Sequence, residues 1–156
     1  MQRLEDGWIY LDKSGVYEYI KNRPPMLFIN DAYVRPGEAA YSIRCLLENE
    51  WYFPGHFPGN PMMPGIAQLE SMFNTAALPI KLLEGYKSKT TNISQIQGTH
   101  FRRHIFPGDT IKVSVSVNKF RRGIAQISGS ITREDEICCE AEFLLVVLDD
   151  VIEVKK

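Results

Sequence analysis

The sequence predicts an α+β domain in which an antiparallel β-sheet packs on one main helix. Strand-like segments rich in β-branched residues lie on both sides of a single strongly apolar helical segment. Clusters of proline, glycine and aspartate separate these segments, as turns do. The length of 156 residues favours one domain covering residues 1–156.

The N-terminal part predicts one short helix followed by two strands. Asp12 is a favourable N-cap for a helix that continues to about residue 22, because its side chain can accept a hydrogen bond from the first turn. Pro24 and Pro25 then end this helix. Two strands are predicted next, at residues 26–34 and 39–48, joined by a turn at residues 35–37.

Residues 51–80 contain a single formally charged residue, Glu70, so a membrane span must be considered. Four prolines and three glycines between residues 54 and 65 interrupt any continuous helix there, which argues against a membrane anchor. We expect an irregular loop leading into a helix at residues 66–77, with Pro64 at its start. This helix is apolar on nearly every side, so it should be buried on most of its surface.

The C-terminal half predicts the rest of the sheet. Residues 111–117 alternate strictly between apolar and polar side chains, which is typical of a half-buried strand. Four strands are predicted, at residues 92–106, 110–120, 124–132 and 137–148.

Composition narrows the class of protein. Eighteen basic and nineteen acidic residues give a net charge of −1, which disfavours a nucleic-acid-binding protein. The acidic residues near Met1 disfavour a signal peptide. Two of the three cysteines, Cys138 and Cys139, are adjacent, so we expect no disulfide framework. We expect the protein in the reducing cytoplasm.

Charge is uneven along the C-terminal half. Residues 100–133 carry seven basic side chains and one acidic one, whereas residues 134–156 carry eight acidic side chains and two lysines. Two interpretations remain open: neighbouring strands attract one another through their exposed faces, or the basic strands form a docking surface for an acidic partner.

Two side chains are candidates for acid–base chemistry. Glu70 lies in the second turn of the apolar helix, where an unpaired carboxylate is costly. It is therefore either paired with an arginine from the strands or held with a raised pKa. His56 lies in a stiff loop of aromatic residues, prolines and glycines. It is either a structural histidine or a general base held beside the buried acid.

The start of the helix is the third candidate feature. A helix N-terminus presents unpaired N–H groups, which could stabilise the oxygen of a thioester carbonyl when a neighbouring proton is removed. Gly65 would let a ligand approach the backbone closely. The alternative is an ordinary first-turn proline followed by a glycine.

The run from His56 to Gly65 (HFPGNPMMPG), followed by Glu70 fourteen positions after the histidine, resembles the signature of the (3R)-hydroxyacyl-acyl-carrier-protein dehydratases. These are hotdog-fold enzymes of fatty-acid synthesis, in which an antiparallel sheet wraps around one long helix. The resemblance continues through the C-terminal half in four short segments: residues 101–103, 107–109, 120–123 and 139–141.

This resemblance implies that His56 and Glu70 form the catalytic pair and that the Gly65 N–H binds the substrate carbonyl. The histidine handles the proton next to the thioester carbonyl, and the acid binds or protonates the departing β-hydroxyl. Water and a trans-2-enoyl thioester result. No metal and no organic cofactor are implied.

The resemblance also implies partners. The carrier protein is acidic, so the basic strands are the expected docking surface, with Arg102, Arg103, Arg121 and Arg122 as its first candidates. A homodimer is expected, because one curled sheet cannot cover so apolar a helix on every side. In such dimers each site takes its histidine from one chain and its glutamate from the other, and three dimers often form a hexamer.

Some positions depart from the family pattern and leave the acyl substrate open. Asn30, Asn60, Ser71 and Asn74 stand where aspartate, arginine, alanine and glutamine are common. The alternatives are therefore a dehydratase of a specialised acyl, polyketide or pigment pathway, a non-catalytic acyl-binding subunit, and a thioesterase on the same fold.

Overall fold

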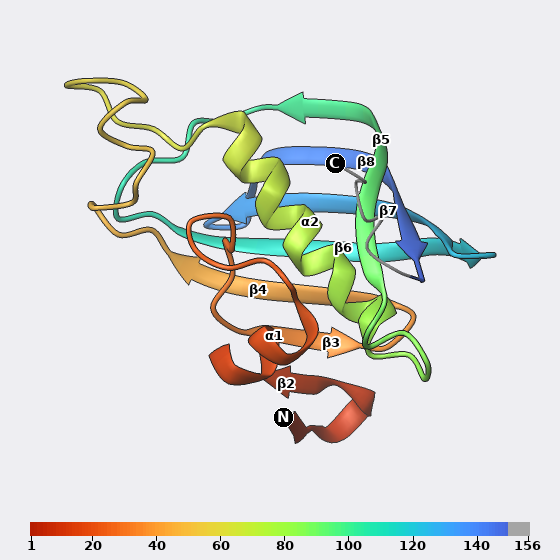
Figure 1. The fold of residues 1–156 in the computed structure, drawn as a ribbon. Coiled ribbons are helices and arrows are strands. Elements are labelled where there is room, and N and C mark those ends of the chain that lie inside the picture. The colour runs from red at the N-terminus through yellow and green to blue at the C-terminus, as the bar shows by residue number, and fades with distance from the viewer. Residues whose placement is uncertain (150–156) are drawn as a thin grey trace, which may run out of the picture.

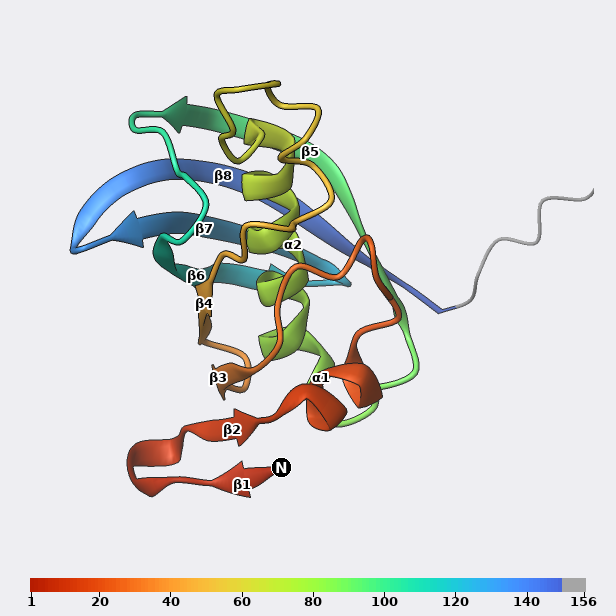
Figure 2. The same cartoon turned by 90° about the vertical axis from the view of Figure 1, so that its left-hand side faces the viewer.

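The computed structural model describes residues 1–149 and confirms the hotdog arrangement, with a single antiparallel sheet wrapped around one long helix (Figure 1). Within these residues the eight strands follow the order β1-β2-β3-β4-β6-β7-β8-β5 across the sheet. The side view in Figure 2 shows how the sheet curls around α2. The strands are β1 (Gln2–Arg3), β2 (Ile9–Leu11), β3 (Ala32–Arg35), β4 (Ala39–Cys45), β5 (Thr90–Phe101), β6 (Thr110–Arg121), β7 (Ile124–Arg133) and β8 (Glu136–Leu148), and the helices are the 3-10 turn η1 (Glu5–Gly7), α1 (Lys13–Tyr19) and α2 (Gly65–Lys81).

The central helix α2 is longer than the sequence predicts. It runs four residues past the expected end at residue 77 and contains Pro79 within its last turn. Leu78 and Ile80, on either side of this proline, are completely buried. Burial of these side chains offsets the cost of a proline in the helix interior, which is about 3 kcal/mol.

Strands β6, β7 and β8 follow the sequence prediction closely. In β6, Ile111, Val113 and Val115 point into the core, which confirms the alternation of residues 111–117. The strand predicted at residues 92–106 corresponds to β5, which ends at Phe101 instead of residue 106. It pairs only with β8 among the described residues and therefore lies at an edge of the sheet.

The prediction of a strand at residues 26–34 is wrong for residues 26–31. Strand β3 begins only at Ala32, and the preceding residues bond to side chains instead of a neighbouring strand. The N–H of Phe28 donates to the Asn74 side chain at 2.8 Å, and its carbonyl accepts from Arg44 at 2.9 Å. These bonds satisfy an extended segment without a sheet ladder.

The N-terminal hairpin of β1 and β2 is not predicted by the sequence. Strand β2 pairs with β3 in antiparallel register, with Ile9 opposite Val34. Such short strands carry too little periodicity for sequence reasoning.

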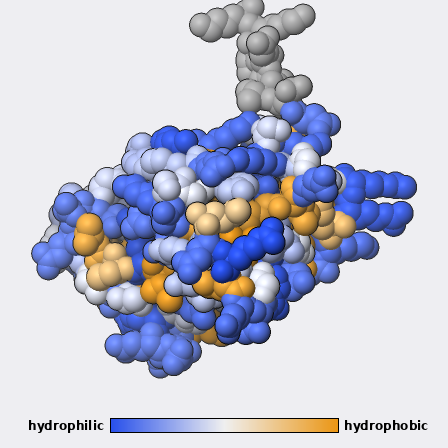
Figure 3. Space-filling view, turned by 90° about the horizontal axis from the view of Figure 1, so that it is seen from below, coloured by the Kyte–Doolittle hydropathy of each residue, from blue (hydrophilic) through white to orange (hydrophobic). Residues whose placement is uncertain are grey.

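Most of the surface is hydrophilic. The face seen from below in Figure 3 carries a broken band of hydrophobic side chains between hydrophilic ones. Among residues 1–149, no helix is long and apolar enough to cross a membrane.

Candidate active site

The loop before α2 holds His56 through its own backbone. The N–H of His56 donates to the carbonyl of Tyr52 at 3.0 Å, and its carbonyl accepts from the N–H of Met62 at 2.8 Å. The ring nitrogen Nδ1 lies 3.0 Å from the carbonyl oxygen of Met62. Because a carbonyl oxygen only accepts hydrogen bonds, Nδ1 carries the ring proton, and Nε2 keeps a free lone pair. In its neutral form, His56 is thus held in the tautomer that a general base requires.

Glu70 is held by two amides and not by an arginine. Its Oε1 accepts hydrogen bonds from the side chains of Asn74, at 2.9 Å, and Asn22, at 3.1 Å. None of the ion pairs within residues 1–149 includes Glu70. Burial raises the pKa of its carboxyl group, and the bond from Asn74 opposes this only in part. The expectation of a raised pKa is therefore confirmed, and the expected arginine partner is absent from the described residues.

Asn22 and Asn74 were not identified from the sequence as partners of Glu70. Asn74 follows Glu70 by four residues on one helix, so the i,i+4 spacing could have indicated this contact. Asn22 is 48 residues away in sequence, and only the fold brings it to the carboxylate.

His56 and Glu70 of the same chain line one cavity of about 380 Å³. The hydroxyl of Tyr52, also in the lining, is buried and has no hydrogen-bond partner within the described part of the chain. The remaining lining is mostly apolar: Met26, Phe28, Trp51, Gly55, Pro64, Ile66 and Ala67.

The N-terminus of α2 opens toward this cavity. No protein group within residues 1–149 accepts from the N–H groups of Gly65, Ile66 or Ala67, and no side chain caps the helix. Gly65 is needed for a reason that the sequence did not show. A Cβ at this position would lie 2.8 Å from Cζ of Phe101, so the glycine makes room for a phenylalanine ring beside the helix start.

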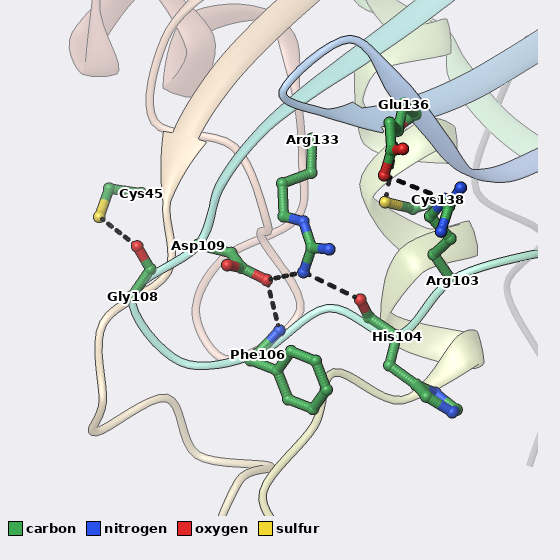
Figure 4. A network of polar contacts seen from close by, with 9 residues as sticks. All are labelled: Cys45, Arg103, His104, Phe106, Gly108, Asp109, Arg133, Glu136 and Cys138. Carbon is green, nitrogen blue, oxygen red and sulfur yellow. Dashed lines mark hydrogen bonds and ion pairs between the residues drawn. The ribbon is translucent and has the colours of Figure 1, made fainter.

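A polar network fixes the segment between β5 and β6 (Figure 4). Asp109 accepts from the N–H of Phe106 and from the Arg133 guanidinium, both at 2.8 Å. Arg133 also donates to the carbonyl of His104 at 3.3 Å. These bonds fix the segment around Ile105. The carbonyl of Ile105 then accepts a hydrogen bond from the N–H of Met63, in the loop before α2, at 2.8 Å. The network therefore anchors the loop that carries His56.

We expect Asp109→Ala to lower the melting temperature by a few degrees and also to reduce turnover, because the anchored segment loses two hydrogen bonds. Thermal unfolding and a turnover assay measure both effects. Glu134→Ala, an exposed change at the next turn, is the matched control. Unchanged turnover in a destabilised Asp109→Ala would show that the network does not position the loop.

The four arginines predicted to dock a partner fall into two separate pairs. Arg102 pairs with Glu140, and Arg103 pairs with Glu136 at 3.1 Å, as expected for strands that attract one another. Arg121 and Arg122 lie at the turn between β6 and β7, at the other end of the sheet. At about 3.3 Å per residue, the pairs are roughly 30 Å apart. Within one chain they do not form one patch.

The cysteines take no part in this site. Cys138 and Cys139 are buried in β8, where they pack into the core. No group of three or more histidine, cysteine or carboxylate side chains within residues 1–149 has the arrangement of a metal site.

Comparison with known proteins agrees with this geometry. Residues 23–142 match the FabA-like domain family. The chain is 35% identical to the 3-hydroxyacyl-acyl-carrier-protein dehydratase FabZ of Lactobacillus helveticus over 140 residues, covering 89% of this chain and 95% of that protein. It is 37% identical to the protein of the same name from Chloroflexus aggregans, and this match covers 89% of this chain and 97% of that protein.

Solved structures share the fold at low sequence identity. A dehydratase heterocomplex, ApeI:P from Xenorhabdus doucetiae, superposes with a TM-score of 0.68 at 10% identity, covering 84% of this chain and 89% of that chain. A hypothetical thioesterase from Streptococcus pneumoniae, solved with coenzyme A, superposes with a TM-score of 0.57 at 10% identity. The match covers 72% of this chain and 80% of that chain. By its sequence match and its fold, this chain belongs to the FabA-like domain family.

Proposed function

We propose that the chain is a single-domain 3-hydroxyacyl-acyl-carrier-protein dehydratase of fatty-acid biosynthesis. One observation carries this proposal: a histidine whose Nδ1 is held by a backbone carbonyl and a partly buried glutamate with a raised pKa line the same apolar cavity. The named FabZ relatives support the activity.

The proposed reaction follows from the surroundings of His56 and Glu70. Nε2 of His56 takes the proton from C2 of the substrate, and the electron pair moves onto the thioester oxygen to form an enolate. This pair then forms the C2–C3 double bond as the C3–O bond breaks. Glu70, whose pKa is raised by burial, gives its proton to the departing hydroxyl, which leaves as water. The free N–H groups at Gly65 and its neighbours stabilise negative charge on the thioester oxygen. These steps need neither a metal ion nor an organic cofactor.

Product analysis separates this function from its alternatives. Incubation with carrier-bound 3-hydroxyacyl chains of several lengths, followed by mass spectrometry, should show loss of one water from the bound acyl group. Release of a free acid and a thiol would indicate a thioesterase instead. A bound but unchanged acyl group would indicate an acyl-binding subunit. A preference for branched or oxygenated chains would place the enzyme in a specialised pathway.

We also propose that an acidic carrier protein docks at Arg102 and Arg103. These residues directly follow Phe101, whose ring lies against Gly65 at the start of α2, so the pair lies beside the catalytic cavity. Both guanidinium groups remain about half exposed despite their ion pairs. A carrier carboxylate could therefore reach them from solvent.

Changing Arg102 and Arg103 together to glutamate should raise the apparent KM for carrier-bound substrate by about tenfold at low salt. The effect should shrink at high salt, because exposed charges are screened. Activity on a small pantetheine thioester should stay nearly constant. The same change at Arg121 and Arg122 is the matched comparison, and a larger effect there would move the docking surface to the other end of the sheet.

We propose that the protein is a homodimer, with a trimer of dimers as its larger assembly. Strand β5 is twelve residues long and leaves one edge without a partner among the described residues. Long free edges invite pairing, and antiparallel pairing of β5 with its own copy makes a closed two-fold dimer. Ile66, on the helix start, is 80% exposed and would be covered by the second copy.

Replacing Ile96 in the middle of β5 by proline should convert the dimer into monomer, because proline removes a backbone donor and bends the strand. Light scattering after size-exclusion chromatography gives the mass directly. A proline at Leu47, in an exposed turn distant from β5, is the control. An unchanged mass for the β5 variant would place the interface elsewhere.

We place this enzyme in the cytoplasm. All three cysteines are free, including the adjacent buried pair in β8, as is usual in a reducing compartment.

A further inference from the structure

A second cavity begins at Glu70 and follows one face of α2 away from the catalytic histidine. It has a volume of about 390 Å³, and the helix contributes Glu70, Asn74, Ala77 and Lys81 to its wall. These positions recur every three or four residues, so they form a single stripe along the helix. Eleven residues separate the two ends of the stripe, which corresponds to about 16 Å of helix. The cavity is thus a channel that starts at the proposed catalytic acid.

The far end of this channel is basic. Lys81 is only 2% exposed, and its ammonium group donates to the backbone carbonyl of Lys89. Lys21 also lines the channel and donates to the hydroxyl of Thr90 at 2.8 Å. Neither Lys81 nor Lys21 forms an ion pair with a carboxylate within residues 1–149, whereas Lys89 pairs with Asp149.

A buried ammonium group without a carboxylate partner is costly and is rarely kept without a use. Burial lowers the pKa of Lys81, and the neighbouring charge of Lys21 lowers it further. An anion that enters the channel would relieve both effects. The middle of the channel is lined by apolar side chains that suit a hydrocarbon: Ile20, Phe73, Ala77, Ile93 and Leu145.

We propose that the preferred substrate is a 3-hydroxyacyl thioester whose acyl chain ends in a carboxylate, bound by Lys81 and Lys21. This inference rests on the proposed dehydratase function. The thioester end lies at His56 and Glu70, the methylene chain lies along the apolar wall, and the terminal carboxylate accepts hydrogen bonds from the two ammonium groups. A simple methyl-ended chain would leave the buried Lys81 without a counter-charge.

The lysines fix the direction of binding, because they attract a terminal carboxylate to the end of the channel away from Glu70. A channel built only for a saturated hydrocarbon would need no lysine at its end.

The test compares three substrates of equal chain length that differ only in their terminal group: carboxylate, primary amide and methyl. Each is offered as a 3-hydroxyacyl pantetheine thioester without phosphate, so the lysines cannot bind a phosphate of the thioester arm instead. We expect kcat/KM for the carboxylate to exceed the other two by about tenfold or more at the best chain length. Lys81→Met should remove most of this preference, lowering kcat/KM for the carboxylate toward the values for the amide and the methyl-ended substrate.

Lys87→Met is the matched control, because Lys87 is an exposed lysine outside the channel that pairs with Glu18. Calorimetric binding of saturated, non-reacting acyl thioesters with the same three ends provides a second measurement that does not depend on catalysis. Tighter binding of the carboxylate form without dehydration would uphold the channel and overturn the proposed reaction. Dehydration with equal rates for all three ends, unchanged by Lys81→Met, would overturn the channel proposal and leave the dehydratase standing.

Discussion

Replacing Glu70 by glutamine should lower turnover by about 10²–10⁴-fold, the usual contribution of a general acid or base. The glutamine side chain has the same shape, and its oxygen can still accept from Asn22 and Asn74. It cannot give a proton to the departing hydroxyl. Steady-state kinetics on a 3-hydroxyacyl thioester measure the loss, and turnover within about threefold of the parent would return Glu70 to a structural role.

Stability provides the control for this variant. Burial raises the pKa of Glu70, so the folded protein binds its proton more tightly than the unfolded chain does. The stabilisation that this group contributes is therefore lost as the pH rises from the ordinary pKa of the unfolded chain through the raised pKa of the folded protein. Glu70→Gln removes that loss, and we expect a melting temperature at neutral pH at least as high as that of the parent. Lost turnover in this variant then reports chemistry and not unfolding.

Mixing two inactive variants should restore activity. The family resemblance implies that each site takes His56 from one chain and Glu70 from the other, and we propose the same arrangement here. A dimer of one His56→Ala chain and one Glu70→Gln chain then has one site with both native groups and one with neither. Because each variant alone is expected to be nearly inactive, the recovered signal should be large.

Both side chains also line a cavity within one chain, so this experiment separates two real arrangements. Subunit exchange is verified first, with a differently tagged copy of each variant. Verified exchange without recovered activity would assign the pair to a single chain and contradict the shared site. It would leave the proposed reaction unaffected.

Sequence reasoning succeeded where local patterns determine structure. The alternation along β6 and the apolar character of α2 were sufficient to predict a sheet around one buried helix. The catalytic pair His56 and Glu70 was implied by the family resemblance, and both side chains line one cavity of the chain. Their catalytic role stays a prediction.

It failed where tertiary contacts override local preference. Residues before Ala32 were predicted to be a strand, but the side chains of Asn74 and Arg44 take the hydrogen bonds that a neighbouring strand would provide. Asn22 could not be assigned to Glu70, because no local pattern connects residues 48 positions apart. The channel toward Lys81 was missed because Pro79 indicated the end of the helix.

The central claim is that His56 removes the C2 proton while Glu70 serves the β-hydroxyl. Its most direct test is exchange of the C2 hydrogen of a 3-hydroxyacyl thioester with deuterated water, followed by mass spectrometry in the parent and both variants. We predict that Glu70→Gln retains exchange at C2 although it forms little enoyl product, and that His56→Ala loses both. Exchange that persists in His56→Ala and disappears in Glu70→Gln would contradict this assignment.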